Sequence, residues 1–361
     1  MFISKKSFFI FITLILSVLI SSFVINFGLF LISYQKNFND KLFIRNEIDK
    51  HNNQEIFINF SRNDFNNSNL ETYIFSGIPN IKTIYCEESN NKAIYLSDRY
   101  GFRNIDKFWD LQDVDMLIMG DSFGNGACVK DEHTINYQLN YEGFKGINLS
   151  YSNNSPLDSL GSLREYGGII NYQFVVYLYY PYNDLAGFEV GLKNPKLNKY
   201  FYDKDFSQNL ISKSAEITNQ LKNIFPKKIQ LFSINELKNL FSFYYLRFYL
   251  NNINQKKIES KYNYKNILQM FQKQKILSDK KFIFVYLPSF YEIKYNYYLE
   301  NYDLDFFKNN NIKFIDIKKI FKNESNDPLN YFVNKKFNHY TPEGYNLITK
   351  EIIKSLKNIQ K

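Results

Sequence analysis

The sequence has few of the side chains that build metal centres. Its 361 residues include two cysteines, Cys86 and Cys128, and three histidines, His51, His133 and His339. A structural zinc site needs about four Cys or His ligands at close spacing. This small and scattered set excludes a site of that kind, and we expect neither a metal nor a cofactor. A mechanism that needs an imidazole has only three candidates.

The sequence also has no concentration of charge of one sign. The formal net charge is +9, but the 45 Lys and Arg residues are spread along the chain. A nucleic-acid-binding protein needs a basic face together with a recognition motif, and we find neither. Hydrophobic residues make up 45% of the chain and charged residues 22%. Such a composition allows a packed core and excludes wholesale disorder.

One long segment without charge lies at the N-terminus. No charged residue occurs from Ser7 to Gln35, and the run Phe8 to Ile32 is almost wholly apolar. This run is long enough to cross a hydrocarbon core of about 30 Å. A cleaved signal peptide has an apolar core of only about 7–15 residues, followed by a small-residue cleavage site, and neither feature is present. We therefore predict an uncleaved single-pass membrane anchor over residues 1–35.

From residue 113 onward, short apolar runs alternate with helical patterns. Strands are expected at 114–119, 144–149, 174–179, 282–287 and 312–317, and helices at 134–140, 157–166 and 342–356. This alternation indicates a parallel sheet covered by helices on both faces. Residues 36–83, rich in Asn and charge, are expected to form a stalk. Residues 187–280 interrupt the alternation and are expected to be a helical insertion in a domain that spans 84–361.

A serine follows the first predicted strand of this sheet, in the sequence Gly120-Asp121-Ser122. A residue between a buried strand and the next helix lies at the carboxyl edge of the sheet, where open α/β folds place their sites. Taken alone, the triplet fits a helix cap equally well, because Asp and Ser are ordinary capping residues. Ser122 is therefore a candidate nucleophile that needs partners.

Two further motifs are expected at the same edge. His339 precedes the last predicted helix, and a serine hydroxyl needs such a base before it can attack. His133 lies at a solvated helix start and His51 in the polar stalk, which leaves His339 as the base. Asn183 follows the third strand, where its amide can donate to an oxyanion. An ordinary turn would also place Asn and Asp there.

In this order, the motifs resemble the blocks of the SGNH (GDSL-type) hydrolase superfamily. Gly120-Asp121-Ser122 is similar to its first block, Asn183-Asp184 to its third, and the His339 loop to its last. The segments 97–104 and 127–129 resemble those of membrane-anchored bacterial members. The resemblance covers most of residues 84–361.

The resemblance implies a three-layer, flavodoxin-like α/β fold with a five-stranded parallel sheet. It also implies that Ser122 is the nucleophile and His339 the base. The oxyanion would then be held by the backbone N–H groups of Ser122 and Asn153 and by the side chain of Asn183. In a bacterium, the anchor would lie in the inner membrane and the catalytic domain in the periplasm or outside the cell.

Two positions depart from the superfamily pattern. Asn153 stands where a glycine is usual, although Asn tolerates the left-handed conformation better than most residues. Lys336 stands three residues before His339, where the superfamily often has the aspartate of its triad. The acid is therefore unassigned at this stage. Asn338, Asp327 or a backbone carbonyl are the expected partners of the imidazole.

These features predict a membrane-anchored serine esterase that acts on O-acyl esters, chiefly O-acetyl esters, of cell-surface glycans. The glycan follows from analogy with anchored relatives of the superfamily. An O-acetyltransferase that uses the same serine is the first alternative. The second is an inactive binding or assembly module, which the missing acid favours.

The two cysteines carry a separate prediction. An even pair of cysteines in an exported domain favours a disulfide, because oxidising compartments preserve such bonds. Cys128 follows the candidate nucleophile by six residues, so a Cys86–Cys128 bond would hold the Cys86 segment beside the active-site edge. The alternative is a pair of buried thiols.

Overall fold

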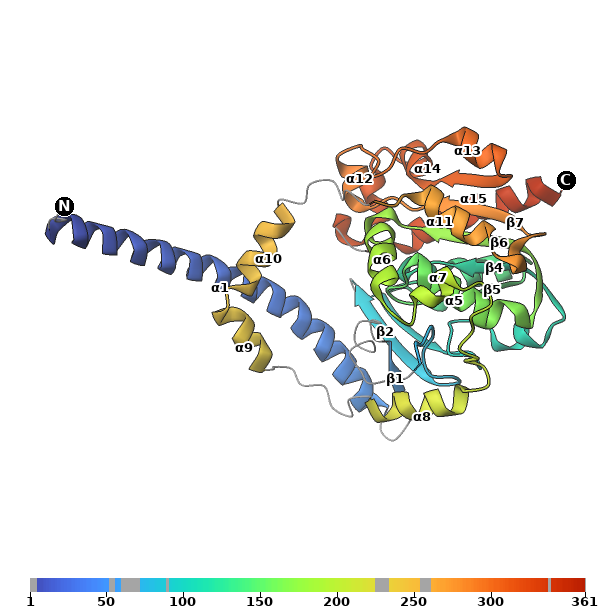
Figure 1. Ribbon diagram of the computed structural model, residues 1–361, viewed down its shortest axis with the longest axis horizontal. Helices are drawn as coiled ribbons and strands as arrows, with labels where there is room; N and C mark the ends of the chain where they lie inside the picture. The colour runs from blue at the N-terminus through green and yellow to red at the C-terminus, as the bar shows by residue number, and fades with distance from the viewer. Residues whose placement is uncertain are drawn as a thin grey trace. The chain divides into compact units, whose positions relative to one another are not determined.

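The computed structural model describes residues 5–51, 56–59, 72–88, 91–224, 234–253, 261–336 and 339–360 (Figure 1). Its internal contacts divide the chain into two compact units. Unit 1 comprises residues 1–52 and 226–259, and unit 2 comprises residues 53–225 and 260–361.

Unit 2 contains a five-stranded, all-parallel sheet with the strand order β5-β4-β6-β7-β8. Its strands are β4 (Asp113–Met119), β5 (Gly146–Asn148), β6 (Asn171–Tyr179), β7 (Lys281–Tyr286) and β8 (Ile312–Asp316). The five strands predicted from apolar runs are all present. Because β5 and β6 lie on opposite sides of β4, the strand order reverses at β4. In open α/β sheets, such a reversal is the place where ligands bind.

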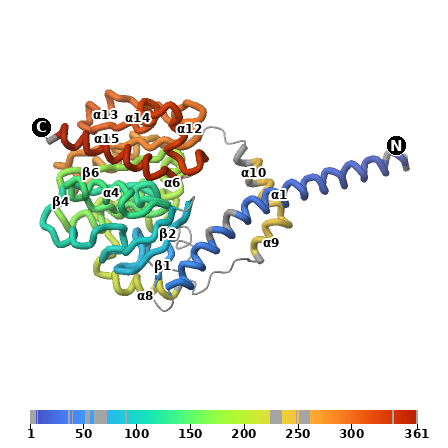
Figure 2. Tube along the Cα trace, turned by 180° about the vertical axis from the view of Figure 1, so that it is seen from behind, coloured from blue at the N-terminus to red at the C-terminus, as the bar shows by residue number. Residues whose placement is uncertain are grey.

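Helices cover both faces of this sheet (Figures 1 and 2). Side chains of one face share a core with α5 (Pro156–Tyr166), α6 (Pro181–Lys193), α7 (Asn198–Tyr202), α8 (Ser214–Ile224), α11 (Tyr264–Gln272) and α13 (Leu304–Asn309). Those of the other face share a core with α4 (Ile135–Tyr141), α12 (Phe290–Lys294), α14 (Ile317–Glu324) and α15 (Pro342–Gln360). The helices predicted at 134–140, 157–166 and 342–356 correspond to α4, α5 and α15.

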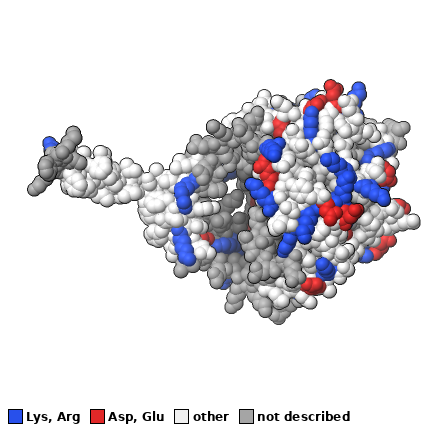
Figure 3. All heavy atoms as spheres, in the orientation of Figure 1, with Lys and Arg blue, Asp and Glu red and all other residues white. Residues whose placement is uncertain are grey.

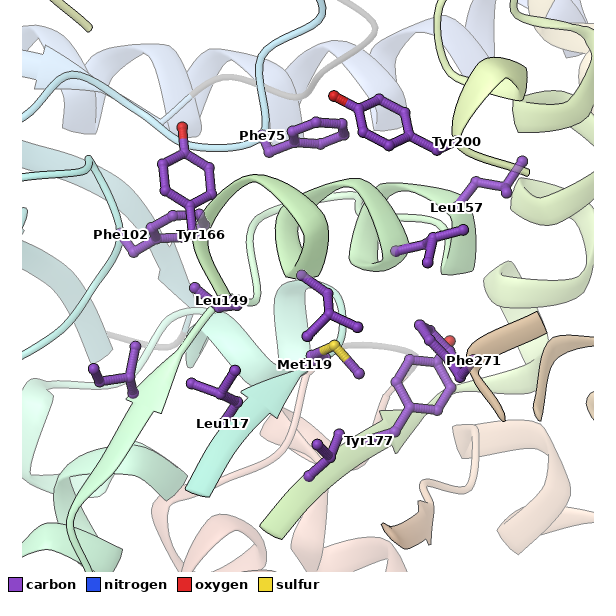
Figure 4. Close-up of a cluster of buried hydrophobic side chains, with 14 of the residues drawn as sticks. Phe75, Phe102, Leu117, Met119, Leu149, Leu157, Tyr166, Tyr177, Tyr200 and Phe271 are labelled. Carbon is purple, nitrogen blue, oxygen red and sulfur yellow. The ribbon is translucent and has the colours of Figure 1, made fainter. Parts of the chain in front are cut away.

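The alternation of side chains along β4 explains the two cores. Leu117 and Met119 point to the core that contains α5, whereas Met116 and Ile118 point to the core that contains α4 and α15. All four side chains are fully buried, which is why this strand is a continuous apolar run in the sequence. Figure 4 shows Leu117 and Met119 beneath α5.

The opposite side of α5 is also covered. Figure 4 shows Phe75 and Tyr200 on the side of α5 that faces away from β4. The ring of Phe75 reaches the helix backbone at Gly161, where any Cβ would collide with it. Phe75 therefore joins the main core, although it comes from the segment predicted to be a stalk.

A second, three-stranded sheet corrects the predicted domain boundary. It consists of β1 (Ile56–Ile58), β2 (Lys82–Glu88) and β3 (Asn91–Leu96), with β1 parallel and β3 antiparallel to β2. A boundary between residues 83 and 84 would cut β2. The described parts of 53–83 belong to unit 2 and bury Phe57 completely. Short apolar patches in an Asn-rich background conceal these strands in the sequence.

Unit 1 is built on α1 (Lys5–Lys50), a single helix of 46 residues. Within it, Phe8–Gln35 is long and apolar enough to cross a membrane. The helix continues past residue 35, so residues 36–50, which were predicted to begin a stalk, extend the same helix. Unit 1 also holds α9 (Ile234–Phe241) and α10 (Tyr244–Ile253).

The segment 187–280 is helical in most of its described part, as predicted. However, it is divided between the two units. The end of α6 and the helices α7, α8 and α11 pack in unit 2, whereas residues 226–259 belong to unit 1. The part of this segment that lies outside unit 2 is therefore limited to residues 226–259, which is shorter than the predicted insertion at 187–280.

Candidate active site

Ser122 begins α3 (Ser122–Asn125), which is a single turn of helix at the carboxyl end of β4. The Asp121 side chain caps this turn by accepting a hydrogen bond of 2.9 Å from the Phe123 backbone N–H. Gly126, at φ 76°, ends the turn in the left-handed conformation that glycine adopts most easily. Ser122 therefore occupies the predicted edge, but on one helical turn instead of a full helix. Because α3 has only four residues, it can stabilise a negative charge through its own backbone N–H groups but not through a long helix dipole.

Three side chains form a hydrogen-bonded chain at this edge. His339 Nε2 lies 3.0 Å from Ser122 Oγ, and His339 Nδ1 lies 3.0 Å from Glu88 Oε1. The backbone N–H of His339 donates to the other Glu88 oxygen at 3.2 Å. Because an ionised carboxylate can only accept, the proton on the imidazole belongs on Nδ1. Nε2 is then free to accept the Ser122 proton, which is the arrangement of a Ser-His-acid triad.

The Phe123 ring packs against the imidazole. Its centroid lies 5.0 Å from that of His339 and 4.4 Å from that of Tyr180. The Tyr340 ring contacts Phe123 at 4.7 Å. Packing on one side and two hydrogen bonds to Glu88 on another fix the plane of the His339 ring.

The carboxylate partner of His339 is the residue that sequence reasoning missed. Asp327, one of the expected partners, instead pairs with Lys335 at 2.6 Å between Oδ2 and Nζ. The Nδ1 position of His339 belongs to Glu88. Asn338, the other side chain considered, lies outside the described residues.

A signal for Glu88 was present in the sequence. Glu88 is the last residue of β2, two positions after Cys86. Cys86 forms a disulfide with Cys128, as predicted, with 5.1 Å between the Cα atoms. A bond from Cys86 to the loop that follows Ser122 holds the end of β2, which includes Glu88, in the neighbourhood of Ser122. The acid lies 251 residues from its histidine, so a search confined to the His339 loop could not find it.

The same three-residue neighbourhood has the composition of a cation site. Ligand atoms of Glu88, Cys128 and His339 lie within 4.8 Å of one another. However, the Cys128 sulfur is bonded to Cys86, and both ring nitrogens of His339 face hydrogen-bond partners. The residues therefore fit a triad better than a metal centre.

The expected oxyanion donors lie near the nucleophile. Asn183, in the first turn of α6, donates from Nδ2 to Asp121 Oδ2 at 2.8 Å, which places its amide beside the residue that precedes Ser122. One hydrogen of this amide is thus used by Asp121, and the second is left for a ligand. Asp121 is buried, and this burial raises the pKa of its carboxyl against the opposing effect of the bonds from Asn183 and Phe123.

Asn153 adopts the left-handed backbone conformation, with φ at 59°. Glycine adopts this conformation most easily, and Asn tolerates it better than most other residues. Asn153 and Asn183 line the same cavity of about 320 Å³. The structure therefore brings both predicted donors to one hollow.

The lining of this cavity is rich in hydrogen-bonding groups. Its polar members are Tyr73, Asn153, Asn154, Ser155, Asp158, Tyr182, Asn183 and Asn194. Apolar surface nevertheless predominates in the cavity, and Ala186, Val190 and Leu197 belong to its lining. Ser122 and His339 are not among the lining residues.

Arg103 braces the loop behind the nucleophile. Its guanidinium is almost fully buried and donates to the carbonyl oxygens of Asn125, Gly126 and Val129. It also pairs with Asp131 at 2.7 Å. These contacts hold the chain between α3 and α4 in place. Arg103, in the segment 97–104, therefore supports the loop that follows Ser122 and does not form part of the site itself.

Replacing Arg103 by Ala is expected to lower the free energy of unfolding by about 3 kcal/mol. The substitution leaves three carbonyl groups and one carboxylate without their buried partner. Urea denaturation followed by circular dichroism measures the change. Lys130→Ala, at an exposed neighbouring cation, should change the same free energy by no more than about 0.5 kcal/mol. Equal effects of the two substitutions would contradict the bracing role.

Loss of the disulfide is expected to affect stability and turnover together. The bond closes a segment of 42 residues, and its removal should cost about 4 kcal/mol in the chain-entropy account. It should also free the end of β2, and with it Glu88. The comparison is between the oxidised chain and the Cys86→Ala, Cys128→Ala double variant, by urea denaturation and ester hydrolysis. A variant that loses stability but keeps full turnover would show that Glu88 is held without the bond.

No protein-family model matches the chain, and neither does any curated protein sequence.

Proposed function

We propose that this chain is a serine ester hydrolase of the SGNH type. The observation that carries the proposal is the chain of hydrogen bonds Glu88–His339–Ser122, with 3.0 Å at each step. In this mechanism Ser122 Oγ attacks the ester carbonyl and its proton passes to His339 Nε2. Glu88 stabilises the imidazolium that results. The imidazolium then protonates the departing alcohol, and a water molecule hydrolyses the acyl-enzyme with His339 again as base.

The negative charge on the carbonyl oxygen requires donors. The Ser122 and Asn153 backbone N–H groups and the second amide hydrogen of Asn183 are the groups assigned to this task. The left-handed Asn153 and the bond between Asn183 and Asp121 support the assignment. Donors held in place before the reaction stabilise the oxyanion without a cost of reorganisation.

The fold supports the same reading. A five-stranded parallel sheet, with helices on both faces and the nucleophile at the strand-order reversal, is the arrangement that the SGNH resemblance implies. We assign unit 2 to the flavodoxin-like SGNH fold on this basis.

The substrate class proposed is an O-acyl ester, chiefly an O-acetyl ester, of a cell-surface glycan. The cavity lined by Asn153 and Asn183 offers amide and hydroxyl groups beside apolar surface, and both could contact an acylated sugar. The anchor and the disulfide suit a protein of the bacterial inner membrane with unit 2 in the periplasm or outside the cell. Both features belong to the proposal of an exported enzyme.

The site geometry bears differently on the two alternative functions, an inactive binding module and an O-acetyltransferase. An inactive binding module was favoured by a missing acid, and Glu88 supplies a carboxylate at the required nitrogen. An O-acetyltransferase would use the same serine and pass the acyl group to an alcohol in place of water. Addition of a sugar alcohol to the assay separates the two, because a transferase forms an acylated sugar faster than free acid.

A serine-directed fluorophosphonate tests the proposal directly. The full chain in detergent is expected to be labelled, because Ser122 is activated by its base. Ser122→Ala should abolish labelling. Ser152→Ala, a partly exposed serine in the next loop along the sheet edge, should retain it. If the wild-type chain is not labelled while circular dichroism shows it folded, the proposal fails.

A further inference from the structure

The apolar run of α1 is longer than a bilayer requires. Phe8–Gln35 has 28 residues, which corresponds to about 42 Å of helix, against about 30 Å for the hydrocarbon core. About 20 residues would be enough to span it. The last two turns of the run therefore lie at or near a membrane surface if the helix spans.

The exposure of α1 changes part-way along this run. Every described side chain from Phe8 to Ile20 is exposed. Beyond it, one face becomes covered at a spacing of four residues, most completely at Asn26 and Phe30, which are 0% and 7% exposed. On the other faces Val24 and Ile32 remain 62% and 71% exposed. Figure 3 shows the exposed stretch of α1 without charged side chains.

The covering element is the hairpin formed by α9 and α10, which also belongs to unit 1. The Phe23 ring lies 6.3 Å from Phe241 and 6.2 Å from Phe243, at the turn between the two helices. Phe30 lies 5.4 Å from Tyr245. The turn thus packs against the middle of the apolar run and not beyond its end. Figures 1 and 2 show α9 and α10 beside α1.

Asn26 joins the two elements. Its Nδ2 donates to the Leu240 carbonyl at 2.7 Å, and its Oδ1 accepts from the Leu246 N–H at 2.9 Å. These are backbone groups in the last turn of α9 and the first turn of α10, where helices leave such groups without a full set of internal partners. The Leu240 carbonyl also accepts from the Phe243 N–H at 3.2 Å. In hydrocarbon such groups must be satisfied by protein. The one fully buried amide in an apolar run thus has a physical reason to be there.

Several large apolar and aromatic side chains of the hairpin are exposed. Leu237, Phe241, Tyr244, Tyr249 and Leu250 are between 39% and 67% exposed. They belong to the element that contacts α1 at Phe23 and Phe30, where the free faces of α1 are apolar as well. Lys238 and Arg247 are exposed on the same two helices. Aromatic and aliphatic side chains with flanking cations are typical of helices that lie in a membrane interface.

We infer that the α9–α10 hairpin is embedded in the lipid leaflet around the second half of the α1 span, with Asn26 pinning it to that helix. Its occupant is the bilayer: acyl chains against Phe241 and its apolar neighbours, and anionic headgroup phosphates against Lys238 and Arg247. The inference rests on the proposal that α1 spans a membrane. It is independent of the esterase activity.

Tryptophan quenching by brominated lipids tests the embedding. The only native tryptophan, Trp109, is buried within unit 2 and gives a constant background. The full-length Phe241→Trp variant is reconstituted in vesicles of phosphatidylethanolamine and phosphatidylglycerol with brominated acyl chains. We expect the added fluorescence to be quenched by more than about half. Tyr141→Trp, at an exposed position of unit 2, is the control for general lipid contact and should not be quenched.

A third variant separates failure of the hairpin from failure of the anchor. Leu16→Trp lies in the part of α1 that is exposed throughout, and it should be quenched if the helix spans. Quenching of Leu16→Trp without quenching of Phe241→Trp would overturn the hairpin inference alone, whether water or a second copy of the chain covers position 241. Loss of quenching at both positions would overturn the anchor and the hairpin together.

The role of Asn26 is tested by a matched pair of substitutions. Asn26→Leu keeps the span apolar but removes both bonds to the hairpin. Thr13→Leu also removes a polar group from the span, but Thr13 bonds only to the Phe9 carbonyl of its own helix among the interactions found. In vesicles, Asn26→Leu should make Lys238 and Arg247 accessible to trypsin and reduce quenching at position 241. Thr13→Leu should change neither. Equal behaviour of the two variants would overturn the pinning.

Discussion

Glu88→Gln is expected to lower kcat for an aryl acetate by about 10⁴-fold. The amide keeps the size of the side chain but no longer requires Nδ1 of His339 to carry the proton. Loss of the carboxylate also removes the charge that stabilises the imidazolium. In serine hydrolases, a change of this kind at the triad acid costs about four orders of magnitude. Steady-state kinetics on the full chain in detergent, with the unfolding midpoint measured in parallel, gives the result.

Two substitutions serve as controls for Glu88. Glu87→Gln removes the neighbouring carboxylate of β2, and Asp327→Asn removes the acid that pairs with Lys335. Neither carboxylate forms a described bond to His339, so both variants should retain turnover within a few-fold of the wild type. If Asp327→Asn were the inactive variant and Glu88→Gln the active one, the assignment of the acid would be wrong.

Ser122→Ala and His339→Ala are each expected to lower kcat by about 10⁶-fold. The double variant should lose little more than either single one, because nucleophile and base act as a unit. The two side chains share one hydrogen bond of 3.0 Å, so removing either breaks the same proton transfer. A progress curve with concentrated enzyme and an activated aryl ester measures these residual rates.

Lys336→Ala is the control for this pair. Lys336 is exposed, stands at the position where the superfamily often carries its acid, and should be dispensable. A His339→Ala variant with undiminished turnover that still depends on Ser122 would show that another group is the base. Multiplicative losses in the double variant would show that the two residues act separately.

The sheet and two of the three triad members were accessible from sequence for a physical reason. A strand buried on both faces must be apolar throughout, so β4 and β6 are contiguous hydrophobic runs. Parallel strands then bring their carboxyl ends to one edge, and residues that follow them meet there. Ser122, which comes directly after β4, obeys this local rule. His339 does not follow a strand, because α14 separates it from β8, and it was identified by its position before the last helix.

Glu88 was not predicted from the sequence, because its position depends on a tertiary contact and not on a local pattern. It ends a strand of the small second sheet, just beyond the segment 36–83 that was predicted to be a stalk. Its approach to His339 is a tertiary contact that no local pattern encodes. The contact between Asn26 and Leu240 spans 214 residues and was hidden for the same reason. For Asn26 the sequence signal was a polar residue in an apolar run, and for Glu88 it was the proximity to Cys86.

The bond between Cys86 and Cys128 makes the arrangement of the site depend on the redox state of the compartment in which the chain folds. It joins the strand that ends at Glu88 to the loop that follows Ser122, and it forms only where thiols are oxidised. A newly made chain in a reducing cytoplasm has the serine and the histidine but lacks the covalent tie that brings the acid to them. In an exported enzyme of this design, maturation of the catalytic centre would coincide with passage across the membrane, and esters inside the cell would be spared.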